Sequence, residues 1–97
     1  MKRILSGVQP SGKPHLGNYL GAMKQHIEMQ KNYEAYLFIA DLHALTTVRD
    51  PEKMRAQTLD LAASYLALGL DPKKTAFFKQ SSVPEHAELC WIFDAIT

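Results

Sequence analysis

The stretch SGVQPSGKPHLGNY, residues 6–19, decides the fold of this 97-residue chain. It follows a short apolar run over residues 3–9 that is typical of a β-strand, turns through glycines and prolines, and enters an amphipathic pattern at Leu16. A loop between a parallel strand and the start of a helix commonly binds phosphate, because its backbone N–H groups point outward and the helix dipole favours negative charge. We therefore predict a nucleotide site in this stretch.

Composition places the chain among small globular proteins. Apolar residues make up 46% and charged residues 22% of a chain long enough for one domain. The net charge of +1 gives no electrostatic reason to expect nucleic-acid binding. No apolar run approaches the roughly 20 residues that span a bilayer, so we expect no membrane partner. The single Cys90 cannot form a disulfide framework, which favours the cytoplasm.

The rest of the chain alternates strand and helix patterns around this loop. Asp50-Pro51 is a typical helix start, and Ser82 with Glu85 matches a capping box. The alternation β-α-β-α-β-α predicts an α/β fold with a parallel sheet and flanking helices. In order after the first strand, we expect a helix from Leu16 to about residues 30–32, a strand over 35–40, a helix over 51–68, a strand over 75–80 and a helix from about Val83.

The first loop partly matches a phosphate-binding loop. Gly7 and Gly12 lie five residues apart and Lys13 follows, as in that motif. The next residue should carry a hydroxyl for magnesium, but it is Pro14, which has neither a hydroxyl nor an N–H group. A phosphate-loop nucleotide-binding module without ligase activity therefore remains an alternative.

A more specific pattern overlaps the same loop. Residues 10–19, PSGKPHLGNY, resemble the HIGH signature of class I aminoacyl-tRNA synthetases, with Asn18 in place of the second His. Residues 6–12, 15–22, 41–47 and 80–86 resemble successive blocks of the tryptophanyl-tRNA synthetase branch, in the same order. The tyrosyl relative usually has His at position 18, and it stays as a second alternative. The resemblance implies a Rossmann-like, HIGH-type nucleotidyltransferase fold.

The resemblance also implies an activity. Enzymes of this branch use ATP and Mg²⁺ to convert L-tryptophan to tryptophanyl-adenylate, then transfer the amino acid to tRNA(Trp), and they work as cytoplasmic homodimers. The second family signature, Lys-Met-Ser-Lys-Ser, is absent from this sequence. We therefore expect residues 1–97 to be the N-terminal part of a catalytic domain that has little activity alone. A fragment that serves only binding or dimerisation is the third alternative.

Site residues follow from the resemblance, position by position. His15 and Asn18 are implied to be catalytic and to stabilise the phosphates in the transition state. The implied ATP-binding residues are Gln9, Pro10, Ser11, Gly17 and Asn18. The implied amino-acid-binding residues are Leu5, Gly7, Gln9 and His43. Magnesium is expected to be held by ATP, because the spacing of His and Cys predicts no metal site in the protein.

Several of these residues also have plainer interpretations. A position in the core would explain Leu5 nearly as well, and a turn would explain Gly7 nearly as well. Loop packing is the plainer explanation for His43. Lys13 is expected to be solvated and Gly21 to allow close packing of helix and sheet. The remaining expectations are that His26 lies at the surface, that His86 is structural, and that Trp91 and Phe93 are core or subunit-interface residues.

Overall fold

A computed structural model describes residues 1–10 and 19–97 of the chain. Its centre is a sheet of three parallel strands in the order β1-β2-β3, as the alternation predicts. The strands are β1 (Arg3–Val8), β2 (Glu34–Ile39) and β3 (Thr75–Lys79). Arg3 pairs with Glu34 at one end of the register and Val8 with Ile39 at the other. All three strands therefore end at the same edge of the sheet.

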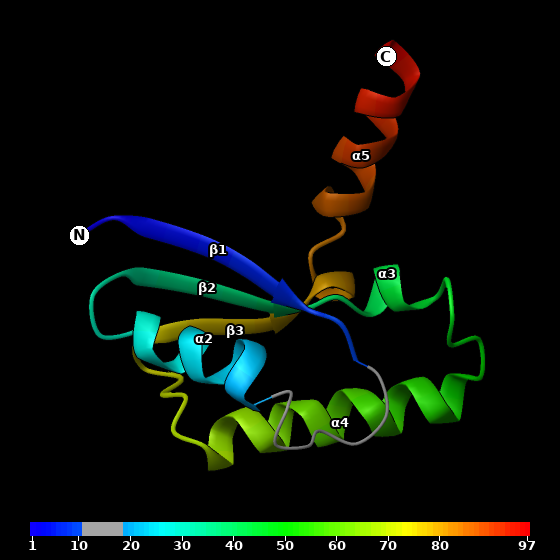
Figure 1. Ribbon diagram of the computed structural model, residues 1–97. Helices are drawn as coiled ribbons and strands as arrows, with labels where there is room; N and C mark the ends of the chain where they lie inside the picture. The colour runs from blue at the N-terminus through cyan, green and yellow to red at the C-terminus, as the bar shows by residue number, and fades with distance from the viewer. Residues whose placement is uncertain (11–18) are drawn as a thin grey trace.

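Helices cover one face of this sheet (Figure 1). They are η1 (Tyr19–Met23), a π-helical segment that leads into α2 (Lys24–Met29), and the long α4 (Pro51–Ala67). Apolar side chains from both layers meet in a single core, because alternate residues of each strand point toward the helices. The buried members of this core are Met23, Leu37, Ile39, Leu61, Tyr65 and Leu70.

Helix α4 confirms the predicted start and nearly the predicted end. Asp50 Oδ1 accepts a hydrogen bond of 3.0 Å from Glu52 N, so Asp50 is the N-cap. Gly69, just past the end, has a φ of +117°, which favours glycine. The expected helix over 51–68 ends one residue earlier, because Leu68 is the C-cap residue and is 44% exposed.

The first helix follows its prediction in part. Its expected start at Leu16 lies outside the described residues, and its end at Met29 is close to the expected end. The π-helical geometry of η1 was not predicted, since apolar spacing hardly separates it from an α-helix. The prediction for Gly21 was wrong: a Cβ there would have no atom of the described residues within 4 Å, so this glycine serves no close packing against them.

Two short helical segments follow the strand ends. They are α3 (Asp41–Ala44), where we expected a loop, and η2 (Gln80–Ser82). The predicted capping box was wrong, because Ser82 already lies in η2 and α5 (Glu85–Ile96) begins after Pro84 without a side-chain cap. Proline suits this position, since its fixed φ, here −57°, already has the helical value.

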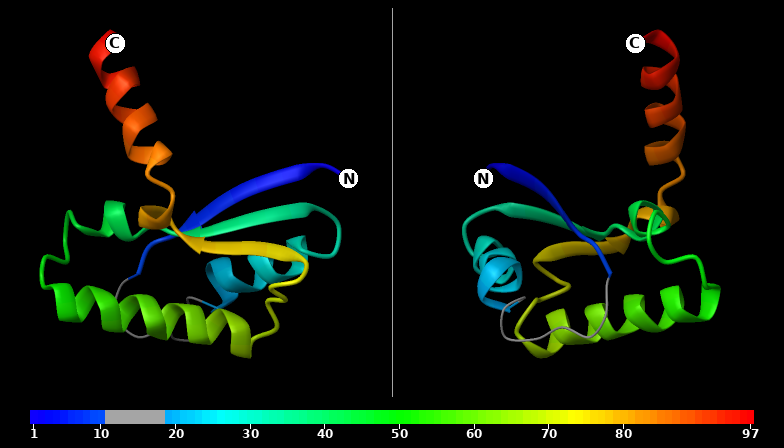
Figure 2. Two further views of the ribbon diagram at one scale, coloured as in Figure 1. Left: turned by 180° about the vertical axis from the view of Figure 1, so that it is seen from behind. Right: turned by 45° about the vertical axis from the view of Figure 1, so that its right-hand side comes forward.

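Helix α5 projects away from the sheet, and both views in Figure 2 show it apart from the other helices. Trp91 is 76% exposed and Phe93 is also exposed, so neither is a core residue of this chain. The sheet face opposite α2 and α4 carries Leu5, which is 62% exposed, and the core interpretation of Leu5 was wrong. In the part of the chain that the structure describes, no helix is both long and apolar enough to cross a bilayer.

Candidate functional site

Three connections meet at the carboxyl edge of the sheet (Figure 1). Gln9 and Pro10 follow β1, α3 follows β2, and η2 follows β3. The first two are adjacent, because Ala40 N donates a hydrogen bond of 2.8 Å to Val8 O just past the paired strand ends. Parallel α/β sheets bind ligands at this edge, where loops and helix starts gather. This edge is the candidate site.

Asp41 holds two of these connections together. Its Oδ1 accepts hydrogen bonds from Ser81 N at 2.9 Å and from Leu42 N at 3.0 Å, and Ser81 Oγ donates to Oδ2. His43 N donates a longer bond of 3.4 Å to Gln80 Oε1. These contacts join α3 to η2. The sequence patterns indicate no role for Asp41, Gln80 or Ser81, although all three lie in the segments that carry the family resemblance.

The predicted ATP-binding residues are described only in part. Gln9 is half-buried and Pro10 is fully buried directly after β1. Pro10 therefore anchors the beginning of the predicted loop against the protein. The other predicted ATP-binding and catalytic residues lie outside the described residues; they are Ser11, His15, Gly17 and Asn18.

The predicted amino-acid-binding residues fall in two places. Leu5 and Gly7 lie on the open face of β1, whereas His43 is exposed on α3 beyond the end of β2. The structure thus joins Leu5 and Gly7 on one face and places His43 at the neighbouring edge. The main chain of His43 is held at the edge by its bond to Gln80, and the role of its side chain stays a prediction.

Aromatic rings adjoin Gly7 on this open face. A Cβ at position 7 would lie 2.5 Å from Cζ of Phe38, so the ring of Phe38 occupies the space that a side chain would need. The ring centroids of Phe78 and His86 lie 6.0 and 5.7 Å from that of Phe38. His86 therefore has the structural role that was predicted for it. Together these rings form an apolar floor beside the strand end.

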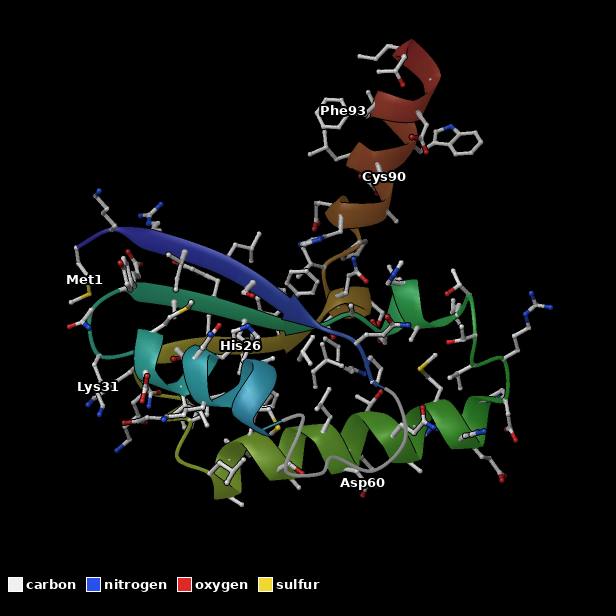
Figure 3. All side chains as sticks on the ribbon, in the orientation of Figure 1. Met1, His26, Lys31, Asp60, Cys90 and Phe93 are labelled. Atoms are coloured by element: carbon white, nitrogen blue, oxygen red, sulfur yellow. The ribbon has the colours of Figure 1, made fainter. Side chains whose placement is uncertain are left out.

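The opposite face of β1 carries a chain of hydrogen bonds. Ser6 Oγ lies 2.9 Å from His26 Nε2, and His26 Nδ1 lies 2.8 Å from the hydroxyl oxygen of Tyr65. A neutral imidazole donates at one nitrogen and accepts at the other, so it can satisfy both neighbours. Figure 3 shows His26 on the side of α2 that faces the sheet. The expectation of a surface histidine was therefore wrong, because His26 links β1 to α2 and α4.

Burial shifts the acid–base properties of this chain of bonds. Desolvation lowers the pKa of His26 below its ordinary 6.5 and raises the pKa of Tyr65 to about 12. The neutral form of both side chains is therefore favoured at pH 7. Within residues 1–10 and 19–97, no three His, Cys, Asp or Glu side chains gather as a possible metal site.

The comparison with protein families decides the membership of the chain. The model for tRNA synthetases class I (W and Y) matches residues 1–97. The chain belongs to this family. Its three-stranded parallel sheet with flanking helices is the corresponding part of the Rossmann-like fold that this class shares.

Curated relatives from this family are tryptophan–tRNA ligases. The chain is 54% identical over its whole length to that of Caldanaerobacter subterraneus subsp. tengcongensis, and covers 30% of that protein. It is 56% identical over 93% of its length to that of Rhodopirellula baltica, and covers 28% of it. The chain thus spans less than a third of the length of these relatives.

Solved structures of the family are similar to this one. The tryptophanyl-tRNA synthetase of Campylobacter jejuni, complexed with ADP and tryptophan, is 46% identical with a TM-score of 0.91, over 98% of this chain and 30% of that one. The tyrosyl-tRNA synthetase of Archaeoglobus fulgidus, complexed with L-tyrosine, is 26% identical with a TM-score of 0.71, over 84% of this chain and 26% of that one.

Proposed function

We propose that residues 1–97 form the N-terminal part of the catalytic domain of a tryptophan–tRNA ligase. The observation that carries this proposal is the identity of about half of all residues with tryptophan–tRNA ligases along the whole chain. Identity to the tyrosyl enzyme is lower, at 26%, which favours tryptophan over tyrosine as the substrate. A phosphate-loop module is disfavoured, because the synthetase family model matches every residue.

The proposed reaction joins the carboxylate of L-tryptophan to the α-phosphate of ATP and then transfers the amino acid to tRNA(Trp). The protein supplies positioning and charge stabilisation for this chemistry. Gln9 and Pro10 begin the proposed ATP loop at the carboxyl edge, which Ser11, Gly17 and Asn18 continue. His15 and Asn18 are proposed to donate hydrogen bonds to the phosphates, while ATP itself brings Mg²⁺.

The open face of β1 is the proposed contact surface for tryptophan. Leu5 is exposed there, and the ring of Phe38, which packs over Gly7, supplies an apolar wall. Apolar and aromatic lining of this kind suits an indole ring. His43 and Gln9, at the neighbouring strand ends, complete the proposed amino-acid site.

Exchange of pyrophosphate into ATP, measured with the full-length gene product that contains residues 1–97, tests this function. We expect exchange that depends on tryptophan. Exchange driven by tyrosine, or by no amino acid, would contradict the proposal. His15→Ala and Asn18→Ala should each slow exchange by about 100-fold, the usual effect of losing one transition-state donor. Lys13→Ala in the same loop is the matched control; a large effect there with none at His15 would favour the phosphate-loop alternative.

The same resemblance supports a homodimer that works in the cytoplasm. Exposed apolar residues such as Trp91 and Phe93 on α5 remain proposed subunit-interface residues. Analytical ultracentrifugation of the full-length gene product should give the mass of two chains, and a monomer at micromolar concentration would contradict the dimer.

A further inference from the structure

A pocket with several charged side chains lies at the carboxyl edge of the sheet. It has a volume of about 300 Å³ and lies between α3, the segment that follows it and the first two turns of α4. Figure 1 shows the chain running from α3 to the start of α4 at this end of the molecule. Its charged lining consists of Arg49, Arg55, Lys79, Asp41 and Asp50. Pockets of this size are at the lower end of those that hold small ligands.

The two carboxylates in this pocket already have partners. Asp41 accepts hydrogen bonds from the main chain of Leu42 and from both the main chain and the hydroxyl of Ser81. Asp50 accepts the capping bond from Glu52 N. Both carboxylates thus hold backbone in place, Asp41 between α3 and η2 and Asp50 at the start of α4, and these hydrogen bonds stabilise their charged form.

The three cations have no such partners. Among residues 1–10 and 19–97 the one ion pair is between Arg3 and Glu34, far from this pocket along the strands. Residues 11–18 contain no acidic side chain, so they provide no counter-ion either. Arg49, Arg55 and Lys79 therefore outnumber the two carboxylates of this pocket by one charge, and the start of the 17-residue helix α4 adds the positive end of its dipole.

We infer that this pocket binds a phosphate group of one of the proposed substrates, which makes the inference dependent on the proposed function. Arginine suits phosphate because its planar fork donates two parallel hydrogen bonds, and lysine adds a compact charge. The phosphate differs from the α-phosphate of the reaction, because Lys79 ends β3, about 10 Å across the sheet from β1. It comes either from the far end of the ATP triphosphate or from the backbone of the tRNA.

The test uses Arg49→Ala, Arg55→Ala and the double variant Arg55→Ala/Lys79→Ala in the full-length gene product. These side chains are exposed and make no described ion pair, so the melting temperature should hardly change. We expect the double variant to raise about tenfold the KM of the substrate whose phosphate binds in the pocket, which is either ATP or tRNA. Lys53→Ala is the matched control, because Lys53 has the same charge on the same helix and does not line the pocket.

Two assays separate the two sources of phosphate. A triphosphate contact raises the KM for ATP in pyrophosphate exchange without tRNA. An RNA contact leaves that constant unchanged, raises the KM for tRNA in charging, and reduces the slope of log K against log salt by about one for each lost contact.

Direct binding of ATP and of tRNA, measured by calorimetry, allows the pocket to be judged without catalysis. Values of KM and Kd that equal those of the unaltered protein in all pocket variants would overturn the inference. If Lys53→Ala weakened binding as much as the double variant does, the inference would also be overturned. The effect would then come from the net charge of the protein and not from the pocket. Absence of exchange in the unaltered protein would contradict the proposed function instead.

Discussion

At Gly7 a single missing Cβ determines how the open face of the sheet is built. The ring of Phe38 lies where the side chain of any other residue would go, and Phe78 and His86 hold that ring. Gly21 shows the opposite case, since a Cβ there would point into open space. Glycines that look alike in the sequence therefore differ in what the fold requires of them.

We predict that Gly7→Ala lowers the free energy of unfolding by about 1–3 kcal/mol, because the Phe38 ring must leave its packed position. Gly21→Ala should raise the same free energy by about 0.5–1 kcal/mol, because alanine loses less backbone entropy in a helix. Urea unfolding followed by circular dichroism measures both. If Phe38→Leu does not reduce the cost of Gly7→Ala in a double-mutant cycle, the steric explanation fails.

The sequence predicted which residues belong to the candidate site, but it did not predict which residues they contact in space. The order of motif blocks placed Gln9, Pro10 and His43 near strand ends, where the structure has them. The link from Asp41 to Ser81 joins residues 40 positions apart, and local patterns carry no information about such pairs. The same holds for His26, whose partners Ser6 and Tyr65 lie 20 and 39 positions away.

At the scale of elements, the helix ends show which local signals were reliable. The Asp50-Pro51 start is confirmed, because the Asp50 side chain caps an N–H only two residues away and Pro51 acts through its own ring, so neither needs a distant partner. The prediction of a capping box at Ser82 was wrong, because Ser82 belongs to the 3₁₀ turn η2, which ends before α5 begins. Part of the same turn is held by Asp41, so tertiary contacts competed with the local signal.

We predict that Asp50→Ala lowers the free energy of unfolding by about 1 kcal/mol, because Glu52 N loses its acceptor. Asp50→Asn keeps an acceptor at this position and should cost less. Ser82→Ala should change the stability by less than about 0.5 kcal/mol, since Ser82 caps no helix. Thermal unfolding of the three variants tests this ranking. If Ser82→Ala lowered the free energy of unfolding as much as Asp50→Ala, Ser82 would have to be a helix cap after all.

At the scale of the whole molecule, the hydrogen-bonded chain Ser6–His26–Tyr65 connects strand β1 to both helices that cover the sheet. Tyr65 is fully buried and belongs to the core cluster. Because His26 has a lowered pKa in the folded state, the unfolded chain binds its proton more readily. The stability of the whole fold is therefore linked to pH through this one imidazole.

We predict that the free energy of unfolding falls as the pH drops below 6.5, the ordinary pKa of histidine, and that His26→Gln makes this fall smaller. At alkaline pH the sign is reversed: the pKa of Tyr65 is raised from 10.0 to about 12, so stability should fall between those values as the unfolded chain loses the phenolic proton. Urea titrations at a series of pH values measure both slopes, and an acid slope unchanged in His26→Gln would contradict this explanation.

The sequence by itself determined the parallel α/β order, the bounds of the strands to within a residue or two, the start of α4 and the family. These depend on apolar periodicity, local capping and motif order, which are properties of the order of residues along the chain. Only the tertiary structure decided which residues meet across the sheet: Phe38 over Gly7, His26 between Ser6 and Tyr65, Asp41 on Ser81, and three cations around one pocket. Such contacts arise when distant elements pack together, and the spacing of residues along a chain does not record them.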